Sequence, residues 1–116
     1  MSGESRPSSA ASMVYVTCGS VNEARQIGET VVRARLAACA NIIDGMHSIY
    51  WWEGAVEDGS ETVLILKTAA VNVPALTARV KALHSYDVPC VVEIPLAGGN
   101  SEYFDWIVAE STANRS

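Results

Sequence analysis

Three short stretches of this chain are apolar at every position and lack the polar alternation of a strand with one wet face. They are MVYV at 13–16, VLIL at 63–66 and CVV at 90–92. Because successive side chains of a strand point to opposite faces, such a strand presents apolar side chains on both sides of its sheet. The fold must therefore bury both faces of a sheet, under its own helices or under another subunit.

Helix-like segments alternate with these strands. Glu23 follows Ser20 by three residues, which is the capping-box signature of a helix start, and apolar residues then recur at spacings of three and four. Asn72, followed by Pro74, predicts the start of a second helix, and Asn100 that of a third. The predicted strands are 13–18, 38–53, 61–68 and 90–96, and the predicted helices are 21–35, 73–83 and 101–111.

The order βαββαβ with a terminal helix predicts an α+β, ferredoxin-like fold. Its four-stranded antiparallel sheet carries both main helices on one face, and a short C-terminal helix ends the domain. Within the long second strand, Asp44-Gly45 predicts a bulge or turn, and Asp58-Gly59 predicts the turn into the third strand. We expect a tail at 1–12 that is disordered, a single domain at 13–112 and a flexible end at 113–116.

The two main helices can cover only one face of this sheet, so we expect another subunit to cover the other. Tyr50 and Trp52 share one strand face, while Trp51 takes the opposite one. Aromatic side chains with a polar end are favoured at interfaces, although an ordinary place in the core is the alternative.

Composition excludes several classes of function. The 116 residues carry a net charge of −5 and no basic stripe, so neither nucleic acid nor an anionic membrane is expected as a partner. No apolar run approaches the ~18 residues of a membrane span. The three cysteines, Cys18, Cys39 and Cys90, are widely spaced and odd in number, which favours a reducing, cytoplasmic setting over a disulfide framework.

Several motifs, in order along the chain, resemble the CutA family of divalent-cation tolerance proteins. They are L-A-A-C-x-N at 36–41, S-x-Y-x-W-x-G at 48–54, ETVLILKT at 61–68, H-x-Y-x-V-P at 84–89 and Y-x-D-W-I at 103–107. The resemblance implies a ferredoxin-like homotrimer in which strands of neighbouring subunits extend each other's sheets. It also implies a role in tolerance to copper and other divalent metals.

The resemblance further implies a copper site, of which Cys18 and His84 match two positions. A second histidine of that site is Leu83 here, and the proline that usually follows is Ser85, so binding should be weak. Thiolate and imidazole together suit copper or zinc. A missing ligand could come from Asp87, Cys90 or Cys39. We expect the first and fourth strands both to run antiparallel to the third, so that the fourth starts at the opposite end of the sheet from where the first finishes. Cys18 and His84 are then not expected to meet within one chain, and we expect a site between subunits.

Other interpretations remain open for these residues. Cys18 could be a small core residue, and His84 could simply cap the end of a helix. No nucleophile elbow, phosphate-binding loop or H-E-x-x-H motif is present, so no enzymatic activity is expected. An alternative function, by analogy of fold, is a PII-like trimeric regulator that binds a small ligand between subunits near Lys67, Glu61 and Tyr86. Glu61 and Lys67 could equally form an ion pair that fixes strand register.

Overall fold

The computed structural model describes residues 10–112, and its elements follow the predicted order. The strands form a single antiparallel sheet in the order β2-β3-β1-β4, which confirms the α+β fold. The elements are β1 (Ala11–Cys18), α1 (Val21–Arg33), β2 (Cys39–Trp52), β3 (Ala55–Ala69), η2 (Ala70–Asn72), α2 (Val73–Leu83), β4 (Val91–Pro95) and α3 (Ser101–Glu110).

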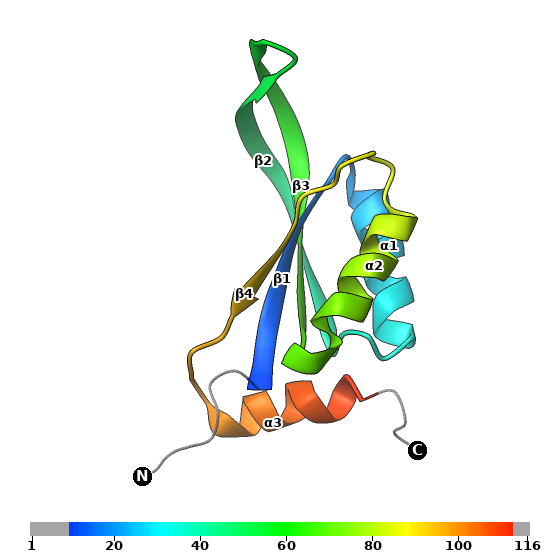
Figure 1. Ribbon diagram of the computed structural model, residues 1–116, viewed down its shortest axis with the longest axis vertical. Coiled ribbons are helices and arrows are strands. Elements are labelled where there is room, and N and C mark those ends of the chain that lie inside the picture. Colours follow the sequence, from blue (N-terminus) through cyan, green and yellow to red (C-terminus); the bar gives the residue numbers. More distant parts are fainter. Residues whose placement is uncertain (1–9, 113–116) are drawn as a thin grey trace.

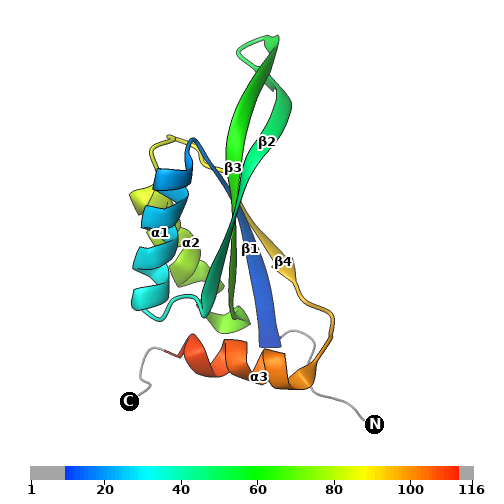
Figure 2. The same cartoon turned by 180° about the vertical axis from the view of Figure 1, so that it is seen from behind.

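The helices lie mainly on one face of the sheet. Helices α1 and α2 lie side by side on one face, whereas α3 lies across the end of the sheet (Figure 1). The view from behind shows the opposite face of the strands without a covering helix (Figure 2). The main core lies between the sheet and the helix pair, and its buried members include Val14, Val16, Cys18, Ile27, Val31, Leu64, Leu66, Leu76 and Val80.

Helix α1 begins at the predicted cap but uses its glutamate differently. The Ser20 hydroxyl oxygen accepts a hydrogen bond from the Glu23 backbone N–H at 3.1 Å, which confirms the cap. The Glu23 carboxylate does not make the reciprocal bond of a capping box. It accepts instead from the backbone N–H groups of Gly19 and Ser85, and so joins the helix start to a distant loop.

The end of α1 is a Schellman motif, because Leu36 N–H donates to Val31 O and Arg35 N–H donates to Val32 O. Arg35 takes the left-handed position of this motif, with φ 62°, where glycine is usual. Its guanidinium donates to the Glu110 carboxylate at 2.6 Å and to the Glu110 carbonyl, so the residue also fastens α3.

The hairpin between β2 and β3 is longer than predicted. Its turn is Glu53-Gly54, with φ values of 50° and 83°, which is the pattern of a two-residue type I′ turn. The predicted turn at Asp58-Gly59 is therefore wrong, since Asp58 pairs with Ile49 inside the ladder. Two positive φ angles in succession let the chain reverse earlier, and β3 then runs through the Asp-Gly pair.

Two further local predictions have opposite outcomes. The bulge at Asp44-Gly45 is confirmed, and the Asp44 carboxylate accepts from the Gly45 N–H and the Thr62 hydroxyl. The predicted cap at Asn72 is wrong, because this residue has helical angles and its side chain makes no cap bond. Its amide donates to the Thr68 hydroxyl and the Ser111 carbonyl, and thereby ties α2 to the end of α3.

The domain starts earlier than the predicted boundary. Ala11 and Ser12, placed in the tail by sequence, belong to β1 and are buried. Most of the predicted tail, residues 1–9, and the predicted flexible end, 113–116, lie outside the described residues.

Helix α3 begins at Ser101 with the predicted cap, where the Asn100 side chain accepts from the Glu102 N–H. None of the helices within 10–112 has the length and apolar character needed to cross a bilayer.

Close packing of α1 on the sheet depends on Gly28. A Cβ atom at this position would stand 3.0 Å from the Ala40 Cβ and 3.4 Å from the Leu64 Cδ1. Replacing Gly28 with valine should overpack this contact and lower the free energy of unfolding by about 3 kcal/mol, measured by urea denaturation. Gly98→Val is the control, since nothing lies within 4 Å of a Cβ there. Equal losses in the two variants would contradict this packing argument.

Candidate functional site

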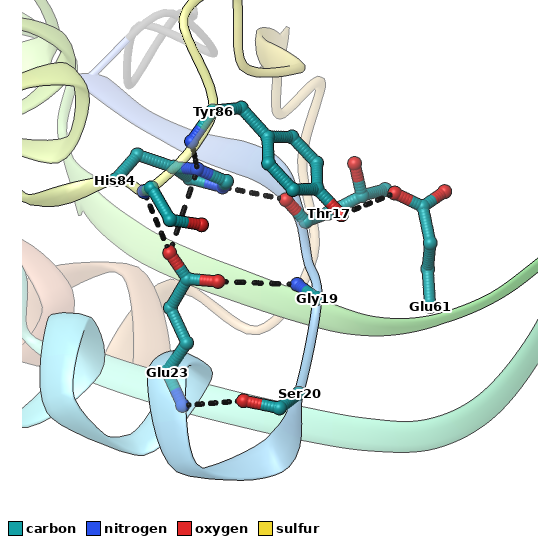
Figure 3. A network of polar contacts seen from close by, with 8 residues as sticks. Thr17, Gly19, Ser20, Glu23, Glu61, His84 and Tyr86 are labelled. Atoms are coloured by element: carbon teal, nitrogen blue, oxygen red, sulfur yellow. Dashed lines mark hydrogen bonds and ion pairs between the residues drawn. The ribbon is translucent and has the colours of Figure 1, made fainter.

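The end of β1 and the end of α2 meet within one chain. The His84 Nε2 atom lies 2.8 Å from the carbonyl oxygen of Thr17, the residue before Cys18. The expectation that Cys18 and His84 stay apart in a single subunit is therefore wrong. Strand β4 is antiparallel to β1, with Val16 paired to Val91, so it starts beside the point where β1 finishes. Helix α2 finishes at that same end of the sheet, which brings His84 over the end of β1 (Figures 1 and 3).

Both ring nitrogens of His84 are engaged. The Tyr86 backbone N–H donates to Nδ1 at 3.1 Å, so Nδ1 acts as an acceptor and carries no proton. The neutral ring then carries its proton on Nε2 and donates it to the Thr17 carbonyl. The side chain is fully buried, and the Tyr86 ring lies against it with centroids 4.6 Å apart.

Glu23 joins three segments around this histidine. Its Oε1 accepts from the Gly19 N–H at 3.2 Å, and its Oε2 accepts from the Ser85 N–H at 2.8 Å and lies 3.6 Å from His84 Nδ1 (Figure 3). Burial acts to raise the pKa of Glu23. Hydrogen bonds from Ser85 and Gly19 outweigh burial and hold this pKa below its ordinary value. The sequence identified Glu23 only as a helix cap, because no local pattern reveals a contact with residue 85.

A second carboxylate, Glu61, lies on the outer side of the same cluster. Its Oε1 accepts from the Ser48 hydroxyl at 2.8 Å, and its Oε2 accepts from the Tyr86 phenol at 3.3 Å. Burial, together with the negative charge of Glu61, raises the pKa of Tyr86, so this phenol keeps its proton and acts as a donor. Glu61 thus ties the hairpin to the loop that follows α2.

Cys18 lies inside the main core at this end of the sheet, with none of its surface exposed. Burial raises the pKa of its thiol to about 12, and the charges of Glu23 and Glu61 act in the same direction. A thiol is a strong metal ligand only after it loses its proton. At neutral pH the Cys18 sulfur is therefore a protonated, apolar packing group.

Cys18 and His84, as they lie in the folded chain, do not fit a copper ion. To bind one, Cys18 would have to ionise in the core, and His84 would have to give up the hydrogen bond at one of its two ring nitrogens. Leu83, the residue before His84, offers no imidazole. Within residues 10–112, no group of three or more His, Cys, Asp and Glu side chains is placed to hold a metal ion.

The remaining candidate residues are dispersed. Cys39 pairs with Lys67 at the opposite end of β3, and its sulfur lies 3.9 Å from the Tyr103 hydroxyl. Lys67 donates to that same hydroxyl at 3.2 Å, whereas Glu61 contacts Ser48 and Tyr86. Glu61 and Lys67 therefore belong to different clusters, and a cleft that used both would have to be built between subunits. Asp87 is exposed, and Cys90 is half-buried just before β4.

The state of Cys18 predicts its reactivity. At about pH 8, iodoacetamide should modify Cys39 and Cys90 in the native protein and leave Cys18 unmodified, as read by peptide mass spectrometry. Protein unfolded in guanidinium should react at all three. Labelling of native Cys18 at the rate of Cys39 would contradict its buried, protonated state.

The same thiol predicts a pH dependence of stability. Its folded pKa, about 12, lies above the unfolded value of about 9. The folded state therefore binds the thiol proton more tightly than the unfolded state does. The resulting contribution to the free energy of unfolding is complete below about pH 9 and is lost as the pH rises toward 12. Alkaline denaturation of Cys18→Ala should be less steep over that interval than that of the wild type. Equal slopes would contradict the raised pKa.

Comparison with known proteins places the whole described domain in a family context. The family described as CutA1 divalent ion tolerance protein matches residues 12–110. A divalent-cation tolerance protein CutA from Thermus thermophilus is 47% identical over 95 residues, which cover 82% of this chain and 92% of the relative. A rice relative, "Protein CutA 1, chloroplastic", is 43% identical over 95 residues, but the match spans only 54% of its length.

Solved structures agree with the sequence comparison. The divalent cation tolerance protein of Thermus thermophilus superposes with a TM-score of 0.85 at 44% identity and covers 88% of this chain and 99% of that one. The CutA structure from Xylella fastidiosa gives a TM-score of 0.87 at 36% identity, over 90% and 100% of the two chains. This chain therefore belongs to the CutA1 divalent ion tolerance protein family.

Proposed function

We propose that this chain acts in divalent-cation tolerance as a homotrimer, and that it does so as a non-enzymatic protein. The tolerance role comes from the names of its relatives, such as the Thermus thermophilus protein. The observation that supports the assembly is the apolar face of the sheet that the helices within residues 10–112 leave largely uncovered, since α3 packs only against its Ala11 end.

This uncovered face is continuous across all four strands. Register places Tyr15 opposite both Ile65 and Val92, and Met13 opposite Ile94, so these side chains share the face away from α1 and α2. Several of its members are strongly exposed in the single chain. Met13, Tyr15, Ile43, Ile65, Val92 and Ile94 form what we call the open face.

The bulge extends the open face into the hairpin. Up to Ile43, which pairs with Val63, the odd-numbered residues of β2 lie on the open face. Beyond the bulge Met46 pairs with Glu61, so the even-numbered residues continue that face. The Tyr15 hydroxyl donates to the Met46 sulfur at 3.3 Å, which agrees with this shift. Tyr50 and Trp52 therefore lie on the same side as the open face.

Unpaired sheet edges support a ring rather than a two-fold dimer. The edge strands, β2 and β4, are different segments with unlike lengths. Pairing β2 of one subunit with β4 of the next would use two different surfaces, and such a contact forms a closed ring where the rotation between subunits closes and an open filament where it does not. Family resemblance supplies the number three.

The energetic argument favours a stable assembly. A standard interface buries about 800 Å² on each partner. If about half of that is apolar, burial at about 25 cal/mol per Å² favours association by roughly 10 kcal/mol per partner before association costs. The exposed side chains of the open face and of the hairpin can supply such an area.

We further propose that copper, or another divalent cation, is bound only weakly by this chain. Leu83 removes one imidazole from the family's copper pattern, and both ring nitrogens of His84 are already engaged in internal hydrogen bonds.

A cytoplasmic location is proposed from the cysteines, all three of which are free thiols. Cell fractionation tests this location, and recovery in a membrane or periplasmic fraction would contradict it.

A growth assay tests the tolerance role. Expressing the chain in a copper-sensitive bacterial strain should raise the copper concentration that the strain survives, compared with an empty vector. Growth without copper is the control for toxicity of expression. Equal copper sensitivity with the protein and with the vector, at confirmed expression, would contradict the proposed role.

A further inference from the structure

We propose that Cys18, His84 and Glu23 form a structural fastener at the end of the sheet where β1 finishes, and that any metal bound by this chain is held elsewhere. The fastener joins the C-terminal end of β1, the first turn of α1 and the loop that follows α2. The inference rests on the proposed function in one respect only, which is that the protein is exposed to divalent cations.

His84 provides the first part of this argument. A metal at Nε2 would displace the bond to Thr17 and leave a buried backbone carbonyl without its donor. A metal at Nδ1 would displace the Tyr86 N–H, and this loop would then lose its hydrogen bond to the ring. Each route breaks a hydrogen bond of a side chain that is completely buried. The ring therefore has no free nitrogen to offer in the folded state.

Glu23 provides the second part. Its two oxygens accept backbone N–H groups from Gly19, before α1, and from Ser85, after α2. The second of these bonds joins residues 62 positions apart in sequence. The carboxylate beside His84 is thus occupied by the backbone on both oxygens, and its geometry is that of a tie between segments.

Cys18 provides the third part. It packs in the main core with Val16 and Leu64 and has no exposed surface. A cysteine in such surroundings behaves as a small hydrophobic residue. A metal would have to enter the core to reach this sulfur. Leu83, where the family's copper pattern has a histidine, is 40% exposed and offers no imidazole.

Calorimetric titration with copper(II) chloride alone tests the inference. The variants are Cys18→Ser, His84→Gln and His84→Asn, and Cys39→Ser and His47→Ala are the matched controls for loss of a thiol and of an imidazole. Glutamine can still donate to Thr17, and asparagine can still accept from Tyr86, so at least one of these histidine variants should fold. Copper affinity should stay within about threefold of wild type in all three fastener variants.

Thermal unfolding supplies the second measurement. His84→Ala and Glu23→Ala should each lower the melting temperature by about 5–10 °C, because each removes hydrogen bonds from a buried cluster. His47→Ala should leave it unchanged, because His47 is exposed on the hairpin. Glu23→Ala and His84→Ala together should lower it by less than the sum of the single effects, since both act on one cluster.

Two results would overturn the inference. One is a thiolate-to-copper absorption band in the wild type that disappears in Cys18→Ser and His84→Gln but persists in both controls. The other is an unchanged melting temperature in His84→Ala. Both results are distinguishable from failure of the proposed function, which would appear as unchanged copper sensitivity in the growth assay while the fastener variants behave as expected.

Discussion

Replacing Val92 with aspartate is expected to dissociate the trimer into folded monomers. Val92 is 49% exposed in the single chain and lies on the open face opposite Tyr15, so aspartate disturbs no core contact of the subunit. In the assembly, the same carboxylate would be buried without a partner at every interface of the ring. Burying an unpaired charge costs several kcal/mol at each of them. Sedimentation velocity should then show one species of 12.4 kDa.

Val71→Asp is the matched control for this variant. Val71 is 86% exposed and lies in η2, at the start of α2 and away from the open face. The same valine-to-aspartate change there should leave the trimer intact. Dissociation by both variants, or by neither, would show that the open face is not the surface that holds the subunits together.

Trp52→Ala is expected to weaken the assembly strongly. Trp52 is 60% exposed in the single chain, and the bulge places it on the same side as the open face. If a neighbouring subunit covers it, its truncation should lower the stability of the trimer by about 3–5 kcal/mol per subunit. The change should appear as a lower melting temperature that depends on protein concentration.

Trp51→Ala provides the comparison. Trp51 is 75% exposed and points to the other side of the hairpin, where it pairs with Val56. We expect a smaller loss of trimer stability for Trp51→Ala than for Trp52→Ala. An unchanged melting temperature for Trp52→Ala would place this indole at the rim of the interface, and a larger loss for Trp51→Ala would reverse the assigned face.

Most of the fold could be predicted from local patterns. The apolar strands, the Ser20 cap, the Asp44-Gly45 bulge and the Asn100 cap all depend on residues close together in sequence, and each is found in the structure. The order of strands and helices along the chain followed from these elements. The uncovered second face of the sheet followed as well, because helix number and strand pattern together set how much apolar surface remains.

The two wrong local predictions, the turn and the helix cap, have a common physical cause. In each, a favourable local sequence competes with a different interaction that the fold offers. Asp58-Gly59 is a better turn sequence than Glu53-Gly54, yet extending the ladder to Trp52 and Ala55 adds paired backbone beyond it. Asn72 has the residue type of a helix cap, but its amide finds Thr68 and Ser111 instead. Ser111 is too distant in sequence to leave a local pattern.

Sequence analysis selected two residues of this cluster as candidates, but it did not anticipate the geometry around them. Sequence motifs selected Cys18 and His84, whereas the direction of β4 relative to β1 was misassigned and the two were expected to lie apart. Contacts of Glu23 with Ser85 and of His84 with Thr17 are long-range, and no single sequence shows them. Those contacts decide whether the pair is available to a metal.

Molar mass in solution tests the central claim most directly. Light scattering coupled to size exclusion should give three times 12.4 kDa, about 37 kDa, at micromolar concentration. That value would agree with a ring of three subunits whose open faces cover one another. A mass of 12.4 kDa under the same conditions would contradict the account, because the open face and the aromatic hairpin would then be stable in water without a partner.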